Sequence, residues 1–202
     1  MFPEARWTSA GYSLNEVEVD EHKRLAAIDL AERLIGIDPT EDAYLDLCYP
    51  YDSRHIAQRM AARQSACALV AAGYLRCLGL RDSNLSGPYY GRNNAVSRLV
   101  QLGVDHGALS RRELPDIGDI VIIGSGLGTH ALVSLGDYLE NGCAWLKSVD
   151  GGRRAVREAR RRIKHLNTGP ALHDSALGTR LVEYRINISL LPFTAELVIP
   201  RP

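Results

Sequence analysis

The chain has 202 residues, which is enough for one domain with a substantial core. Its composition, 46% hydrophobic and 24% charged, is typical of a globular protein. Basic and acidic residues number 24 each, so net charge does not draw the chain to nucleic acid or to a membrane surface. The four cysteines have no metal-like spacing, and no apolar run approaches the ~20 residues of a membrane span.

The N-terminal stretch MFPEARWTSAGYSLNEVEVD has acidic residues where a signal peptide has a basic start and an apolar run. We therefore expect the chain to be made in the cytoplasm and to remain there at first. We also expect a single domain over residues 1–202, with residues 1–12 as a flexible N-terminal extension.

Two helices are predicted at the start of the chain. A capping box at Ser13–Glu16 precedes apolar residues at helical spacing, which indicates an amphipathic helix ending at Gly36. Asp38-Pro39 indicates the start of a second, short helix, which Pro50 stops.

A third helix is predicted to be central and buried. Residues 52–64 are mostly polar, and the run from 66 to 78 is apolar on all sides, as in a helix with no exposed face. Cys67 would then lie in the first turn of this helix, provided that the chain breaks near Gln64. Residues 86–94 indicate a loop, and residues 95–102 a further short helix.

The second half of the chain predicts strands. Residues 119–124, 129–136 and 143–149 are short runs rich in β-branched residues, separated by turn sequences, and residues 180–191 alternate like a strand. The arginine-rich segment 153–164 is ambiguous, although its pattern alone favours a helix. Helices followed by a meander of strands predict an α+β fold, in which N-terminal helices pack on an antiparallel sheet.

Three residues could form a nucleophilic site. A cysteine at a helix N-terminus becomes reactive when an imidazole lies nearby, which points to Cys67 and to His130 at the start of a predicted strand. Asp150 closes the next strand and could orient the imidazole. Each residue also has a structural explanation: Cys67 as a small core thiol, His130 as a satisfied strand-end histidine and Asp150 as a turn aspartate.

The order of these features resembles the NlpC/P60 and CHAP-type cysteine peptidases and amidases. The resemblance rests on AIDLAERLIG, on a cysteine opening an apolar helix, and on LPDIGDIVIIGSGLGTHALVSLG, in which a Gly-Asp pair and an apolar strand precede a strand that begins with histidine. SVDGGRRAVREARRRI and LVEYRINISLLPF are similar to the ends of some family members. The resemblance covers roughly residues 26 to 192.

The resemblance implies a papain-like domain that hydrolyses an amide bond, with Cys67 as nucleophile, His130 as base and Asp150 as the third residue. It implies a peptide or peptidoglycan fragment as substrate and no metal or organic cofactor. A wall substrate for a chain without a signal peptide suits delivery by a phage or a secretion system, or a cytoplasmic peptidase that recycles wall fragments. A protein partner such as an immunity protein is compatible with delivery. Tyr49 and Tyr51 could line the cleft ahead of Cys67, or could belong to a packed loop.

Two departures from the family motifs leave another function open. Ala66 and Ala68 flank Cys67 where the family usually has Asp-Cys-Ser-Gly, and Ile117 stands where the family has proline. The alternative is an inactive papain-like module that binds a peptide or a partner protein. A third hypothesis, nucleic-acid binding through residues 153–164, predicts a steep salt dependence and conflicts with the balanced overall charge. We therefore expect no nucleic-acid partner and no membrane partner.

Overall fold

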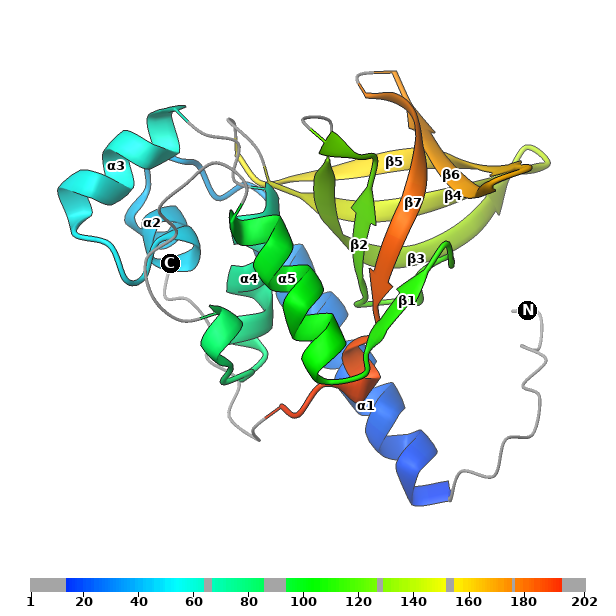
Figure 1. Cartoon of the computed structure of the whole chain (residues 1–202), viewed down its shortest axis with the longest axis horizontal. Helices are drawn as coiled ribbons and strands as arrows, with labels where there is room; N and C mark the ends of the chain where they lie inside the picture. Colours follow the sequence, from blue (N-terminus) through cyan, green and yellow to red (C-terminus); the bar gives the residue numbers. More distant parts are fainter. Residues whose placement is uncertain are drawn as a thin grey trace.

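Helices from the first half of the chain pack against an antiparallel sheet from the second half, so the fold is α+β (Figure 1). The computed structural model describes residues 14–63, 67–85, 94–126, 129–151, 155–175 and 177–193. The helices in these ranges are α1 (Leu14–Arg33), α2 (Asp42–Cys48), α3 (Arg54–Arg63), α4 (Cys67–Cys77) and α5 (Asn94–Asp105), with short 3-10 helices η1 (Ser83–Leu85) and η3 (Ile188–Leu190). The strands are β1 (Leu109–Arg111), β2 (Ile120–Ile123), β3 (His130–Glu140), β4 (Cys143–Asp150), β5 (Arg157–Leu166), β6 (Gly169–Asp174) and β7 (Gly178–Ile186).

The described strands form one antiparallel sheet that closes on itself. Their order is β1-β7-β2-β3-β4-β5-β6, and β6 also pairs with β7. Strands β2 to β7 therefore make a six-stranded barrel, and β1 lies beside β7 as an additional short strand. The antiparallel sheet is confirmed as predicted, whereas its closure into a barrel was not predicted.

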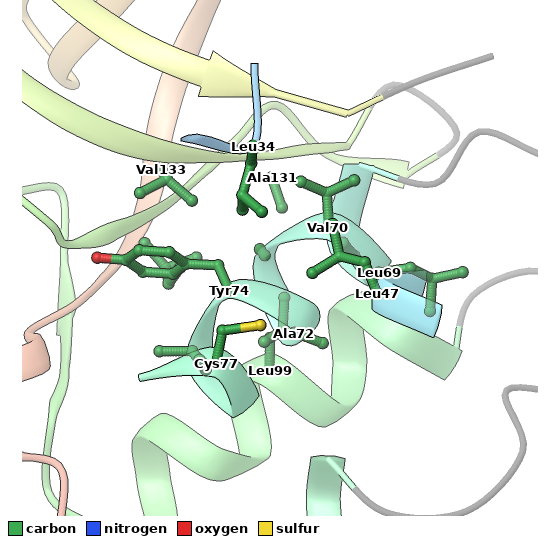
Figure 2. Close-up of a cluster of buried hydrophobic side chains, with 14 of the residues drawn as sticks. Leu34, Leu47, Leu69, Val70, Ala72, Tyr74, Cys77, Leu99, Ala131 and Val133 are labelled. Atoms are coloured by element: carbon green, nitrogen blue, oxygen red, sulfur yellow. The ribbon is translucent and has the colours of Figure 1, made fainter. Parts of the chain in front are cut away.

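Strand β2 and residues 131–134 of β3 are buried on both faces, which explains the apolar sequence of this part of the sheet. One face of the two strands, with Ile120, Ile122 and Val133, packs against the helices, and the other, with Val121 and Leu132, fills the barrel interior. Figure 2 shows part of the contact between helices and barrel, in which the following side chains lie together: Leu34, Val70, Tyr74, Ala131 and Val133.

Helix α4 is the central helix of the domain, as its sequence predicts. All of its residues except Arg76 are buried, and α2, α5 and β3 pack around it. Gly73 allows α2 to approach closely, because a Cβ atom there would lie 2.5 Å from the backbone oxygen of Leu47. The helix is therefore held on several sides, with its first residue next to the barrel strands.

The Gly118-Asp119 pair joins α1 to the barrel. Asp119 is fully buried, and its carboxylate accepts hydrogen bonds from Arg24 of α1 at 3.3 Å and from Arg185 of β7 at 2.5 Å. Gly118 has φ of +84°, and a Cβ atom there would lie 2.6 Å from Ile188 Cδ1. The Gly-Asp pair thus has a structural role at the junction of helix and sheet.

The arginine-rich segment is a strand, so the helix favoured by its pattern was wrong. Residues 157–166 form β5, which pairs with β4 on one side and β6 on the other. Its buried residues, Arg161 and Ile163, alternate with exposed ones, which is the period of a strand. Arginine and alanine favour helices locally, and pairing with two neighbouring strands outweighs that preference.

The second predicted helix starts later than expected. Helix α2 begins at Asp42, because the Asp38 side chain accepts hydrogen bonds from Thr40 N at 2.9 Å and Thr40 Oγ1 at 2.7 Å and holds the Asp-Pro segment in a turn. The last predicted strand ends at Ile186 rather than at residue 191, because the Asn187 side chain accepts from Ser189 N and starts η3.

Helix α3 and the short strands β1 and β6 have no counterpart in the sequence prediction. Helix α3 buries only small side chains, Ala57 and Ala61, so its sequence looks polar throughout. The predicted N-terminal extension at residues 1–12 and the capping residue Ser13 lie outside the described residues. Within the described residues, no helix is long and apolar enough to cross a membrane.

Candidate active site

Cys67 is the first residue of helix α4. Helix α3 ends at Arg63 and runs in a different direction from α4 (Figure 1), and residues 64–66 between them lie outside the described residues. The N–H groups in the first turn of a helix have no intrahelical acceptors, and their partial positive charge favours a thiolate. The residue is 7% exposed, so only a small part of it reaches solvent.

His130 lies between Cys67 and a carboxylate. It is the first residue of β3, and its Nε2 atom lies 3.0 Å from Asp150 Oδ2. A second side-chain hydrogen bond joins the ring to Cys67. Because Nε2 faces Asp150, Nδ1 is the ring nitrogen left for the Cys67 sulfur. The three predicted catalytic residues therefore come together in the order cysteine, histidine, aspartate.

The register of the barrel brings His130 and Asp150 together. Asp150 is the last residue of β4, and it pairs with Leu132 across the β3–β4 ladder. His130 precedes Leu132 by two positions, so its side chain lies on the same face of the sheet, which is the barrel interior. The two side chains therefore occupy the end of the barrel that α4 approaches.

Asp150 is also held from inside the barrel. Arg161 of β5 donates from Nη1 to Asp150 Oδ1 at 3.0 Å and from Nη2 to Oδ2, and Ser148 Oγ donates to Oδ1 at 3.0 Å. Arg161 and Asp150 are 1% and 3% exposed. Sequence reasoning missed Arg161, because a helix over residues 153–164 gives it no fixed relation to Asp150. The available signal was its place in an alternating run, two positions before Ile163.

The charges of the site are set by these contacts. Burial acts to raise the pKa of Asp150, but hydrogen bonds and charges from His130 and Arg161 lower it to about 2. Burial is also the largest influence on the pKa of His130 and lowers it, yet interactions with Asp150 and Cys67 raise it to about 9. At neutral pH Asp150 is therefore ionised and His130 is protonated. An imidazolium beside Cys67 favours the thiolate form of the cysteine.

The other three cysteines lack this environment. Burial raises the pKa of Cys48 to about 12 and that of Cys77 to about 11. Cys143 is partly exposed at the start of β4, and all four thiols are free of disulfides. Only Cys67 among them has a histidine partner in the part of the chain that the structure describes.

The two predicted substrate-binding tyrosines lie in different places. Tyr49 is 2% exposed, and no hydrogen-bond partner is found for its hydroxyl among the described residues. Tyr51 is 46% exposed and lies 6.0 Å from the Arg76 guanidinium, beside a cavity of about 320 Å³. Arg76 lies nine residues after Cys67, about 14 Å along the helix, so this cavity is separate from the cysteine. A substrate-binding role for the two tyrosines stays a prediction.

The chain matches no protein-family model, no curated protein and no solved structure. Within the described ranges, no group of three histidine, cysteine, aspartate or glutamate side chains is placed to hold a metal ion. A thiol at a helix N-terminus, an imidazole within hydrogen-bond reach and a buried carboxylate behind the imidazole are the components of nucleophilic acyl transfer.

Proposed function

We propose that this protein is a thiol hydrolase that cleaves an amide bond. The observation that carries the proposal is the position of His130, which hydrogen-bonds Cys67 on one side and Asp150 on the other. A histidine with a purely structural role does not require a thiol at one ring nitrogen and a buried carboxylate at the other. The same constellation is the reason to propose a papain-like relationship for the helices and barrel.

The proposed reaction begins with attack of the Cys67 thiolate on the carbonyl carbon of the scissile amide. The backbone N–H groups in the first turn of α4 are the donors that we propose for the oxyanion that forms. Protonated His130 then gives its proton to the leaving amine, which leaves an acyl group on the sulfur. His130, now neutral, takes a proton from water, and the resulting hydroxide equivalent releases the acid. Asp150 keeps the imidazole oriented throughout.

For the substrate we propose a peptide of the bacterial cell wall, on the basis of the sequence resemblance. The described side chains around Cys67 supply nucleophile, base and orienting carboxylate, and the choice of wall peptides comes from the family motifs alone. For such a substrate we propose synthesis in the cytoplasm and delivery by a phage or a secretion system.

The test is hydrolysis of purified peptidoglycan and its soluble fragments, followed by the appearance of new amino groups and by mass spectrometry of the products. The wild-type protein is expected to release amines, and Cys67→Ala is expected to reduce release to background. Cys143→Ala is the matched control, because Cys143 is partly exposed and lies at the other end of β4 from Asp150.

The alternative is a module that binds a peptide or a partner protein without cleaving it. The limited exposure of Cys67, together with Ala66 and Ala68, motivates this reading. Wall fragments that bind with measurable affinity and remain intact over long incubation would establish the alternative and refute hydrolysis.

A further inference from the structure

The barrel interior contains a buried arginine with a carboxylate on either side. Arg161 donates to both oxygens of Asp150, and its Nη1 atom also donates to Ser148 Oγ at 2.6 Å. Its Nε atom lies 2.9 Å from Asp174 Oδ2 of β6, as an ion pair whose N–H direction falls outside hydrogen-bond geometry. Arg161 is 1% exposed, so water screens these charges little.

Fold stability alone gives a poor reason for this arginine. Removing charges from water is expensive, and apolar side chains of similar volume often replace a buried ion pair without loss of stability. The other residues in the barrel interior, such as Leu146 and Ile163, show that this space accepts apolar packing. A charged residue at position 161 is therefore better explained by what it does to Asp150.

The contacts fully occupy the Asp150 carboxylate. Oδ1 accepts from Ser148 and Arg161, and Oδ2 accepts from Arg161 and faces His130. A carboxylate held in this way cannot rotate away from the imidazole. The positive charge of Arg161 also favours the ionised form of Asp150, which burial disfavours.

We propose that Arg161 is a positioning residue of the active site, which acts through Asp150 and uses Asp174 as its second counter-charge. The catalytic part of this inference rests on the proposed function, whereas the effect on Cys67 can be measured without any substrate. Among the described residues, the charged and titratable groups in contact with Arg161 or its partners are His130 from β3, Asp150 from β4 and Asp174 from β6, and Arg157 of β5 pairs with Asp150 in the ladder. On the helix side they are Cys67 and Tyr44.

The experiment measures the rate of Cys67 alkylation by iodoacetamide as a function of pH, because only the thiolate reacts. In Arg161→Met, Asp150 loses two hydrogen bonds and its internal cation, so its pKa is expected to rise and its support of a protonated His130 to weaken. The pH at half-maximal alkylation is expected to rise by about one unit or more relative to the wild type. Arg161→Lys keeps the positive charge but loses the two-armed contact with Asp150. Its pH at half-maximal alkylation is expected to lie between the values for the wild type and for Arg161→Met.

The matched control is Arg160→Met. Arg160 precedes Arg161 on the same strand, but its side chain is 59% exposed and lies on the outer face of the barrel, over the Tyr138 ring. This variant is expected to leave the alkylation profile unchanged. It removes the same charge from the same strand, so it separates the position of the charge from its presence.

A double-mutant comparison tests whether the effect passes through Asp150. Asp150→Asn is expected to shift the profile in the same direction, and adding Arg161→Met to it is expected to cause little further shift. Additive shifts would overturn the inference, and so would a folded Arg161→Met protein with the wild-type profile. If Arg161→Met does not fold, a wild-type profile for Arg161→Lys overturns it.

The two proposals can fail separately. A shifted alkylation profile in a protein that hydrolyses no wall fragment supports the positioning role and refutes the proposed function. Undiminished hydrolysis in Arg161→Met, together with an unshifted alkylation profile, refutes the positioning role and leaves the proposed function standing.

Discussion

At the scale of single residues, the protein places one of its four cysteines in an activating environment. Cys67 has a helix N-terminus on its own backbone and an imidazolium beside its sulfur, and both favour the thiolate. Cys48 and Cys77 are buried, and for both of them burial outweighs the charge of Arg76 and favours the neutral thiol. Reactivity therefore follows from position in the fold, since the side chains are chemically identical.

This difference predicts selective alkylation. At neutral pH, a limiting amount of iodoacetamide is expected to modify Cys67 before Cys48 and Cys77, whose raised pKa values leave almost no thiolate. Cys143 is the informative competitor, because it is more exposed and has no histidine partner among the described residues. Mass spectrometry of the digested protein locates the adducts. Preferential labelling of Cys143 would indicate that Cys67 is an ordinary buried thiol.

The protonation of His130 predicts the alkaline limit of the proposed hydrolysis. Its pKa is raised to about 9 in the folded protein, so the proton needed by the leaving amine is present below that pH and is lost above it. Hydrolysis is therefore expected to decline as the pH rises through about 9. In Asp150→Asn the decline is expected at lower pH, because a neutral amide does not stabilise the imidazolium. Identical alkaline limits in both proteins would refute this account of His130.

At the scale of elements, the site depends on how α1 and the barrel are joined. Asp119 and Gly118 lie at this junction, where Arg24 and Arg185 approach the carboxylate and Tyr74 Oη donates to the Gly118 oxygen at 3.0 Å. Tyr74 belongs to α4, so the same contact fixes the helix that begins with Cys67. A change at this junction should therefore lower the stability of the helix–barrel contact as a whole.

Gly118→Ala tests the junction. The new Cβ would lie 2.6 Å from Ile188 Cδ1 at a residue with φ of +84°. The free energy of unfolding, measured with urea, is expected to fall by about 2 kcal/mol or more. Gly142→Ala is the control, because φ there is +71° and no atom lies within 4 Å of the new Cβ. It is expected to lower the same free energy by only about 1 kcal/mol. Equal losses would show that the close contact at Gly118 contributes nothing.

At the scale of the whole molecule, local patterns predicted most helices and strands, and long-range pairing decided the rest. The apolar run of α4 and the β-branched run of β2 identify their elements because each is buried on all sides. Barrel closure depends on β6 pairing with both β5 and β7, which no local pattern contains.

The candidate site was predictable to a similar extent. Cys67, His130 and Asp150 were recognised from their order and their positions at the ends of elements, and they do lie together. Arg161 could not be recognised, because its role follows from the register between β4 and β5, in a segment whose composition favours a helix. Recognition of Arg161 therefore requires knowledge of the tertiary fold, whereas the three residues of the site can be recognised from local sequence signals.

The central claim is that Cys67 is the nucleophile in amide cleavage. The most direct measurement is to stop the reaction of the wild-type protein with wall peptide fragments in acid, digest the protein and search each cysteine for an acyl group by mass spectrometry. The acyl group is expected on Cys67, and it is expected to be absent when His130 is replaced by alanine. Cleavage that proceeds with the acyl group on another residue, or at the full rate in Cys67→Ala, would contradict the account.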